Sequence, residues 1–307
     1  MTLPLSFEKN AVQPEETGPP IAFVRRRYSI PSIIADVWGS RYLVGQFVLR
    51  DITLRYTQAV MGVAWALLMP LLIVGAGLMF RVVVARMSGS PVEGASIVSL
   101  AAKAIAWAFF SSTLATATQT IIGNSNLIGK IYFPRESLPV ATVLGQSIDL
   151  LVGVVLLSAI VPFTAVSFHW SALWAPVILV LLVLFTTGCA LLLSCANLFY
   201  RDVKYIVQVV LNFGMFGTPV FFEPQLLGRK GALIMMSLPL SPFLQALDIC
   251  VVRGHSLLTT TTFESTKGPI TIWAPWMFGY AVASSVSVFC AGLLIFRRAS
   301  SRFAEMA

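Results

Sequence analysis

The sequence predicts an all-α integral membrane protein with six transmembrane helices. Of its 307 residues, 57% are hydrophobic and only 11% are charged, whereas a soluble domain carries roughly 25% charged residues. No Asp, Glu, Lys or Arg lies between Arg55 and Arg81, an interval long enough to cross a bilayer as a helix. Most of this chain is therefore expected to lie in lipid.

Charge and cysteine usage exclude several other classes of protein. The net charge of +8 is compatible with nucleic-acid binding, but the basic residues flank apolar segments, which is typical of membrane topology. We therefore predict a membrane and no nucleic acid as partner. The four cysteines, Cys189, Cys195, Cys250 and Cys290, lack metal-binding and redox spacings and are expected to be small buried residues. No metal site is predicted.

The first segments are expected to lie in the cytoplasm and on the membrane surface. Residues 1–31 contain prolines and an arginine triplet without the apolar core of a signal peptide, which predicts a disordered cytoplasmic tail. Residues 32–56 are predicted to form an amphipathic interfacial helix. Asp51 interrupts its apolar face, so we expect a bend near Arg50 and an i,i+4 pair between Asp51 and Arg55. The apolar face consists of Ile33, Val37, Val44, Phe47 and Val48.

Residues 57–298 are the predicted transmembrane domain, and residues 299–307 form a second tail. Each span is close to the ~20 apolar residues that ~30 Å of hydrocarbon requires. Between the fifth and sixth spans, Ala232–Val252 contains Pro239 and Pro242, which favours a bent helix pair, re-entrant or external, over a seventh straight span. The six spans are predicted at 58–82, 97–121, 139–163, 173–197, 205–223 and 271–296.

The distribution of basic residues predicts the orientation. Lys and Arg are concentrated in the segments that are cytoplasmic when the N-terminus is inside, as the positive-inside rule requires. Both termini are therefore predicted to be cytoplasmic.

The loop Gly123–Glu136 is the first candidate for chemistry. Five residues separate Gly123 from the next glycine where a phosphate-binding loop requires four, and Ile131 replaces the required Ser or Thr, so nucleotide hydrolysis is not expected. Aromatic and basic residues on a short loop suit docking into a partner's groove, although an ordinary positively charged loop has the same composition. The docking residues would be the exposed Tyr132, Phe133 and Pro134 with Lys130 and Arg135.

Two Arg-Asp dipeptides precede predicted spans. Arg201-Asp202 precedes the fifth span as Arg50-Asp51 precedes the first. Neighbouring Arg and Asp side chains can pair across helix ends or anchor another subunit. Simple solvated charge is the alternative.

Ionisable and aromatic residues inside the spans are the remaining candidates. Lys103 lies near the outer end of the second span, where its stem can reach outward. Asp149 lies near the middle of the third, where a charge costs about 2.5–3.5 kcal/mol. It requires a hydrogen-bond partner, such as Ser147 or a facing helix, or it has a role in substrate binding or gating. The spans also contain aromatic residues whose rings either line a pore and stack on sugars or face the core or the lipid. They are Trp65, Trp107, Phe109 and Phe110.

Three segments taken together resemble the ABC-2 type permeases of polysaccharide exporters. They are RDITLRYTQAVMGVAWALLMPLL from Arg50, NLIGKIYFPRESLPVA from Asn126 and NLFYRDVKYIVQVVLNFGMFGTPVFF from Asn197. The resemblance runs in order from about Leu49 to Phe222. Ser241-Pro242 stands where that family has Asn-Pro.

The resemblance implies a transport subunit with no enzymatic activity of its own. It implies a homodimer in the bacterial inner membrane, served by two copies of a separate ATP-binding subunit that binds ATP and Mg, with no cofactor on this chain. The cargo would be a lipid-linked O-antigen, capsular polysaccharide or teichoic acid. The residues expected to couple to the ATPase are Arg50, Asp51, Arg55, Lys130, Tyr132, Phe133, Pro134, Arg135, Arg201 and Asp202. The candidate substrate path comprises Trp65, Trp107, Phe109, Phe110 and Asp149.

Two other functions are considered. One is an ABC-2 exporter of a small lipophilic compound or drug. The other is a membrane enzyme acting on lipid-linked sugars, which requires clustered carboxylates or histidines at one membrane face. Asp149 and scattered loop charges do not form such a cluster in the sequence.

Overall fold

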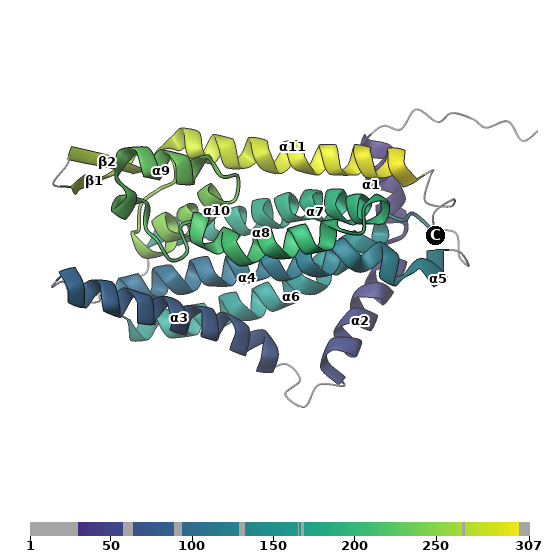
Figure 1. Ribbon diagram of the computed structural model, residues 1–307, viewed down its shortest axis with the longest axis horizontal. Helices are drawn as coiled ribbons and strands as arrows, with labels where there is room; N and C mark the ends of the chain where they lie inside the picture. The colour runs from purple at the N-terminus through teal and green to yellow at the C-terminus, as the bar shows by residue number, and fades with distance from the viewer. Residues whose placement is uncertain are drawn as a thin grey trace, which may run out of the picture.

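The computed structural model describes residues 30–57, 64–88, 94–128, 133–164, 166, 169–265 and 268–300. These residues form an elongated helical bundle (Figure 1). One end carries α1 and α5, and the other carries α9 and a β-hairpin; we call them the α1 end and the hairpin end. The α-helices are α1 (Ile30–Gly39), α2 (Arg41–Thr57), α3 (Ala64–Ser88), α4 (Gly94–Gly123), α5 (Ser125–Ile128), α6 (Ser137–Ile160), α7 (Ala175–Phe199), α8 (Val203–Gly217), α9 (Gly228–Ser237), α10 (Ser241–Leu247) and α11 (Pro275–Ser300). Short helical turns are η1 (Val161–Phe163), η2 (Trp170–Trp174), η3 (Pro224–Leu227) and the π-helix η4 (Asp248–Val252).

Four long helices form the centre of the bundle. Within the described ranges, four helices are long and apolar enough to cross a membrane: α4, α6 with the adjoining η1, α7 with the preceding η2, and α11. The helix α7 packs between α4 and α11. A Cβ atom on Gly188 of α7 would lie 2.6 Å from the backbone of α11, and one on Gly292 of α11 would lie 2.6 Å from the Gly188 carbonyl. These two glycines therefore permit the close approach of α7 and α11.

The four long helices match predicted spans two, three, four and six, and α8 is shorter than predicted span five. The helix α3 has 25 residues, and its side chains are described only in part, including the apolar run Leu71–Val83. The helix α8 has 15 residues, which gives about 22 Å at 1.5 Å per residue. The helix α8 ends where Thr218 is extended, because the following Pro219 disfavours helical backbone at the preceding residue. The prediction of six spans is thus supported for four.

The bent segment after α8 is present. The helices over Pro224–Ser237 and Ser241–Val252 meet at 112°, and Pro239 lies in the break between them. This confirms the predicted bent helix pair in place of a seventh straight span. We call α9, α10 and η4 the bent pair.

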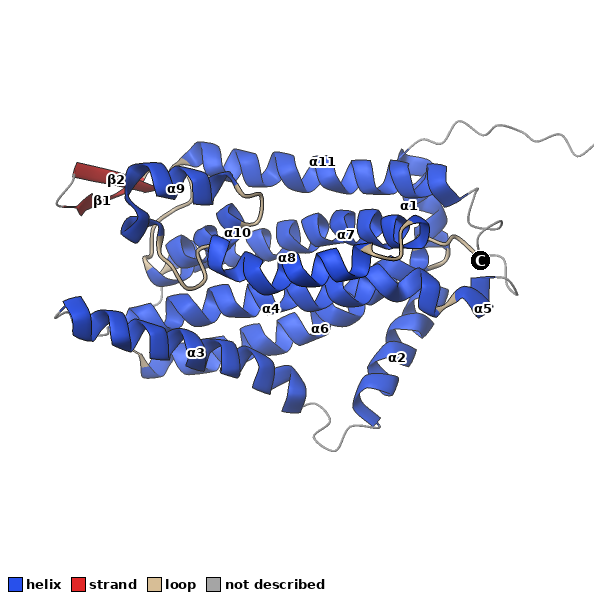
Figure 2. Ribbon diagram, in the orientation of Figure 1, coloured by secondary structure: helices blue, strands red, loops and turns tan. Residues whose placement is uncertain are grey.

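The structure is consistent with the predicted all-α membrane protein, and it adds one element that was not predicted. A two-stranded antiparallel sheet is formed by β1 (Thr261–Ser265) and β2 (Gly268–Trp273) at the hairpin end (Figure 2). Threonines and isoleucines favour strands, and the buried Trp273 anchors the hairpin by donating from Nε1 to the Leu257 carbonyl at 2.9 Å. Because β2 extends to Trp273, α11 begins later than predicted span six.

The predicted interfacial helix is two helices. The chain breaks at Gly39–Ser40, and α2 continues without interruption through Arg50, where we had expected the bend. Glycine has the lowest helix propensity after proline, and the hydroxyl of Ser40 donates to the Asp36 carbonyl at 3.0 Å. Since α1 begins at Ile30, the first tail is shorter than predicted, and most of both tails lies outside the described residues.

Candidate functional site

The α1 end has its own hydrophobic core. Three side chains of the predicted interfacial segment, Ile33, Val44 and Phe47, are buried against α4, α6, α7 and α11. The rings of Phe47 and Phe133 lie 5.7 Å apart. The first segment after the N-terminal tail is therefore packed on the bundle, and the loop before α6 is packed on α2.

This packing corrects one expectation for the loop. Phe133 was predicted to be exposed for docking, but its side chain is buried because Phe47 covers it. Pro134 and Arg135 are half-buried, and Arg135 donates from Nη1 to the Ser300 carbonyl at 2.8 Å. Lys130 and Tyr132, the other loop residues predicted to couple, lie outside the described residues.

A charge cluster joins three distant segments at this end. Arg297 on α11 contacts Asp36 on α1 at 2.7 Å and Glu136 before α6 at 3.1 Å. Glu136 is completely buried, so its carboxylate depends on Arg297 for neutralisation. We call Asp36, Glu136 and Arg297 the α1-end cluster. None of the three is among the functional residues predicted from the sequence.

Arg55 and Asp149 form the central contact of the site. Arg55, near the end of α2, donates from Nη1 to the Asp149 carboxylate on α6 at 2.7 Å. The expected i,i+4 pair of Asp51 and Arg55 is therefore wrong. Asp149 has its partner on a facing helix, one of the alternatives considered, and not at Ser147, which donates to the Val143 carbonyl.

Polar side chains extend this contact into the bundle. Gln146 accepts from Arg55 and from Ser112 of α4, each at 3.3 Å, and donates to Thr116 at 3.3 Å. The network thus connects α2, α6 and α4. A charge in the middle of a predicted span is stabilised by an opposite charge supplied by the surface segment. We call the Arg55–Asp149 contact the bridge.

The two Arg-Asp dipeptides have different environments. Arg50 pairs with its neighbour Asp51 at 2.9 Å and lies 5.3 Å from the centroid of the Phe47 ring. Arg201 and Asp202 are exposed, and the Asp202 carbonyl accepts from the first turn of α8. The resemblance between the dipeptides therefore does not extend to their contacts.

The aromatic candidates of α4 lie in the main core. Trp107 and Phe109 are buried, and Phe110 is partly buried. Phe110 has its ring 5.9 Å from Trp107 and 6.1 Å from Phe185. In this conformation these rings pack on neighbouring side chains. Trp65 belongs to α3, but its side chain lies outside the described part of the structure.

A second charge cluster lies at the hairpin end and was missed by the sequence analysis. Lys103 does not reach outward as expected: it is completely buried, with its ammonium group 3.8 Å from the Asp248 carboxylate of the bent pair. Arg253 contacts Asp248 at 2.8 Å and Glu223 at 3.6 Å, and Arg81 of α3 contacts Glu223 at 3.1 Å. We call these five residues the hairpin-end cluster. It joins α3 and α4 to the bent pair.

Arg253 remains a cation in this environment. Burial lowers the pKa of its guanidinium, but the charge of Asp248, the hydrogen bond to Asp248 and the charge of Glu223 outweigh burial and raise this pKa above its ordinary value. Among the described residues, His, Cys, Asp and Glu form no group of three that could hold a metal ion.

Comparison with known proteins gives one family. Residues 42–251 match the family model described as "ABC-2 type transporter". Similar curated proteins include two from Klebsiella pneumoniae and one from Myxococcus xanthus, all named "O-antigen export system permease protein RfbA". One Klebsiella protein is 25% identical to this chain, over 62% of this chain and 73% of its own length. The other is 23% identical, over 84% of this chain and 92% of its own length. The Myxococcus protein is 23% identical over 68% and 79%.

Proposed function

The chain belongs to the ABC-2 type transporter family, and from this premise we propose that it is the permease subunit of a polysaccharide exporter. Its cargo would be a polyprenyl-linked cell-surface glycan such as O-antigen. It would cross the bacterial inner membrane by ATP hydrolysis on a separate subunit, present in two copies on a homodimeric permease. The observation that carries the choice of cargo is the match over 92% of the length of a relative named as an O-antigen export permease.

The orientation proposed for this subunit puts the α1 end in the cytoplasm. The last turn of α11 carries Arg297 and Arg298, and Arg135 and Arg201 lie at the same end. A concentration of arginines at one end of membrane helices favours the cytoplasmic side. The ATP-binding subunits would then meet α1, α2 and the loop before α6.

The bridge suggests how a push from the ATPase would reach the transmembrane helices. The Phe47–Phe133 contact and the α1-end cluster hold α1, α2 and the loop on the bundle as one unit. Arg55 then connects this unit to Asp149, twelve residues inside α6 from its first residue, Ser137. A displacement of α2 would pull directly on α6 through a charge-assisted contact, which is stronger than a neutral hydrogen bond.

The glycan path is proposed to form between two copies of the chain. Large apolar side chains on α8 are exposed in the single chain, among them Tyr205, Val209, Phe213 and Phe216. A face of this kind suits contact with lipid or with a second copy. Trp107 and Phe109 would reach such a path only after α4 repacks, because both are buried now.

Deletion of the gene in the source bacterium tests the proposal. The expected result is loss of surface polysaccharide together with accumulation of polyprenyl-linked glycan inside the cell, reversed by the intact gene. Glycan on the surface would be measured by immunoblotting of intact cells, and lipid-linked glycan by mass spectrometry of membrane extracts.

The same strain distinguishes the other functions. If the chain exported a small lipophilic compound, surface glycan would be unchanged and a compound would be lost from the medium. If it were an enzyme acting on lipid-linked sugars, the deletion would change the chemical structure of the glycan and would leave the glycan on the cell surface. Either result would overturn the proposal.

A further inference from the structure

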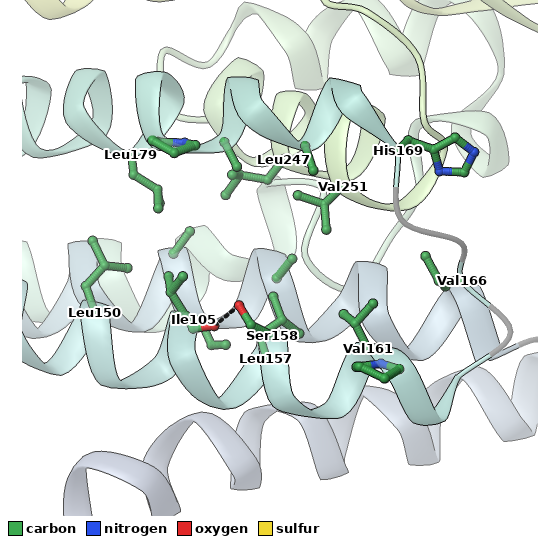
Figure 3. A pocket seen from close by; sticks show the side chains of 17 residues that line it. Ile105, Leu150, Leu157, Ser158, Val161, Val166, His169, Leu179, Leu247 and Val251 are labelled. Carbon is green, nitrogen blue, oxygen red and sulfur yellow. Dashed lines mark hydrogen bonds between the residues drawn. The ribbon is translucent and has the colours of Figure 1, made fainter.

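An apolar cavity lies inside the single chain, away from the bridge. Its volume is about 480 Å³, and it lies between α4, α6 and α7, with the bent pair closing one side (Figure 3). On α6 and the first residue of η1, the lining residues recur at helical spacing from Leu150 to Val161, a length of roughly 16 Å. The lining is apolar apart from Ser158 and His169, and the Ser158 hydroxyl already donates to the Val154 carbonyl at 2.8 Å.

Water is a poor occupant of such a space. An ordered buried water requires two to four polar partners, and cavities lined by apolar side chains stay dry and take up apolar molecules instead. An unfilled cavity leaves its lining side chains without contacts on one side. The structure therefore favours an apolar occupant.

The position of the cavity indicates where that occupant comes from. Its walls are three of the four helices long enough to span a membrane. Beside the lining residues, Val155 of α6 and Val180 of α7 are 67% and 68% exposed, so apolar surface continues outward from the walls. His169 lies at one end of the cavity, near Val161 and Val166 (Figure 3), next to the exposed Trp170. Trp is typical of the membrane interface, and α7 begins after this segment on the side of the hairpin (Figure 1).

The volume selects among lipid chains. A water molecule occupies about 30 Å³ of the liquid, and a methylene group is of similar size, so the cavity has room for about 16 methylene groups. That is one acyl chain of a phospholipid. Most of a polyprenyl chain of several dozen carbons would remain outside the cavity.

We propose that this cavity binds one acyl chain of a membrane phospholipid, with its head group at the His169 end. The chain fills the space between α4, α6 and α7 and packs on Leu247 and Val251 of the bent pair. These residues flank Asp248 in the sequence, so the lipid supports the bent pair close to the hairpin-end cluster. The inference does not rest on the identity of the exported cargo.

Photo-crosslinking tests the proposal directly. The full chain in nanodiscs is illuminated with phosphatidylethanolamine that carries a diazirine on its palmitoyl chain, and adducts are located by peptide mass spectrometry. We expect adducts on the α6 and α7 walls near Leu157 and Leu179. Leu179→Trp, which fills the cavity, should reduce them at least fivefold, whereas Val180→Trp, an exposed neighbour, should leave them within twofold of wild type.

Other outcomes would overturn it. Equal labelling of Leu179→Trp and Val180→Trp, or no adducts on these walls, would show that the cavity does not take up the acyl chain. A parallel arm with a diazirine-bearing polyprenyl phosphate tests the source, and wall adducts from that probe alone would contradict a phospholipid. None of these readouts depends on transport. Failure of the lipid proposal can therefore be distinguished from failure of the proposed export function, which the gene deletion tests.

A second measurement covers variants that fail to fold. Leu157→Trp fills the cavity from the opposite wall and should also reduce the adducts at least fivefold. Removal of lipid with detergent should lower the Tm of wild type and Val180→Trp more than that of a folded Leu179→Trp or Leu157→Trp variant, because the indole takes the place of the acyl chain. The same loss of Tm in all four proteins would contradict the proposal.

Discussion

The two ends of the bundle use charge differently. At the hairpin end, Lys103 and Asp248 are both essentially without solvent exposure, and the cluster around them joins α3, α4 and the bent pair. At the α1 end Glu136 is buried, but Arg297 and Asp36 remain partly exposed, and their cluster ties a short terminal helix to α11. One cluster lies within the body of the protein, and the other attaches a surface segment to it.

The difference separates a structural role from a transmitting one. Breaking a buried ion pair from one side leaves an uncompensated charge in a low dielectric, which costs about 3–5 kcal/mol. Ion pairs near the surface contribute about 0–1 kcal/mol because water solvates the separated charges. The hairpin-end cluster should therefore resist rearrangement, whereas the α1 end can respond to a partner.

The largest effect is expected for Asp248→Asn. The substitution leaves the buried Lys103 ammonium without its carboxylate, and we expect the free energy of unfolding to fall by about 3–5 kcal/mol. Thermal and denaturant unfolding of the purified protein in micelles would measure it.

The control for this variant removes both charges. Lys103→Met with Asp248→Leu removes both fully buried charges, while the partly exposed Arg253 keeps its contact with Glu223, and it should recover most of the lost stability. A double variant as unstable as Asp248→Asn would show that the charge of Lys103 is not the cause.

A smaller effect is expected for Arg297→Ala. It leaves the buried Glu136 carboxylate without Arg297 and releases Asp36. Because the Arg297 side chain is itself 18% exposed, water can enter the space that it vacates, and we expect a loss of about 1–3 kcal/mol, smaller than that of Asp248→Asn. The loss should be accompanied by faster hydrogen exchange in α1. Arg298→Ala, an exposed arginine at the next position, should leave α1 exchange unchanged. Slow exchange of α1 in Arg297→Ala would contradict the attachment of this helix by the α1-end cluster.

The smallest effect is expected for Arg50→Ala. Its pair with Asp51 is formed between sequence neighbours, and the two side chains are 40% and 27% exposed. We expect a loss of no more than about 1 kcal/mol, measured by the same unfolding experiment. A loss as large as that of Asp248→Asn would remove the distinction between exposed and buried charge.

Predictions from the sequence succeeded where a local pattern decides the structure. Long apolar runs predicted α4, α6, α7 and α11, and Pro239 and Pro242 predicted the bent pair. The hairpin was not predicted because the apolar residues of β2 continue almost directly into those of α11, so span six was predicted to begin at residue 271, inside β2. The break at Gly39 was missed because Asp51, which interrupts the apolar face, was taken as the stronger signal.

The contacts between charges could not be predicted in the same way. Arg55 has Asp51 one turn away, but the packing of α2 on α6 brings it to Asp149, 94 residues later. Lys103 can reach outward from its own helix, but the bent pair covers it with Asp248. Helix packing decides both partners, and periodicity within one segment carries no information about them. An intramembrane Asp and Lys do, however, signal that partners exist.

The measurement that tests the central claim most directly is a charge exchange at the bridge. The permease with its ATP-binding subunits in proteoliposomes would be compared for glycan exported per ATP hydrolysed. We expect Arg55→Asp and Asp149→Arg each to lower this ratio at least about fivefold, the low end of typical coupling energies. The double exchange should restore most of it, with Arg229→Ala, an exposed arginine of α9 at the hairpin end, as the control that leaves it unchanged. Single variants that export at the wild-type ratio, or a double exchange no better than the singles, would contradict coupling through Arg55 and Asp149.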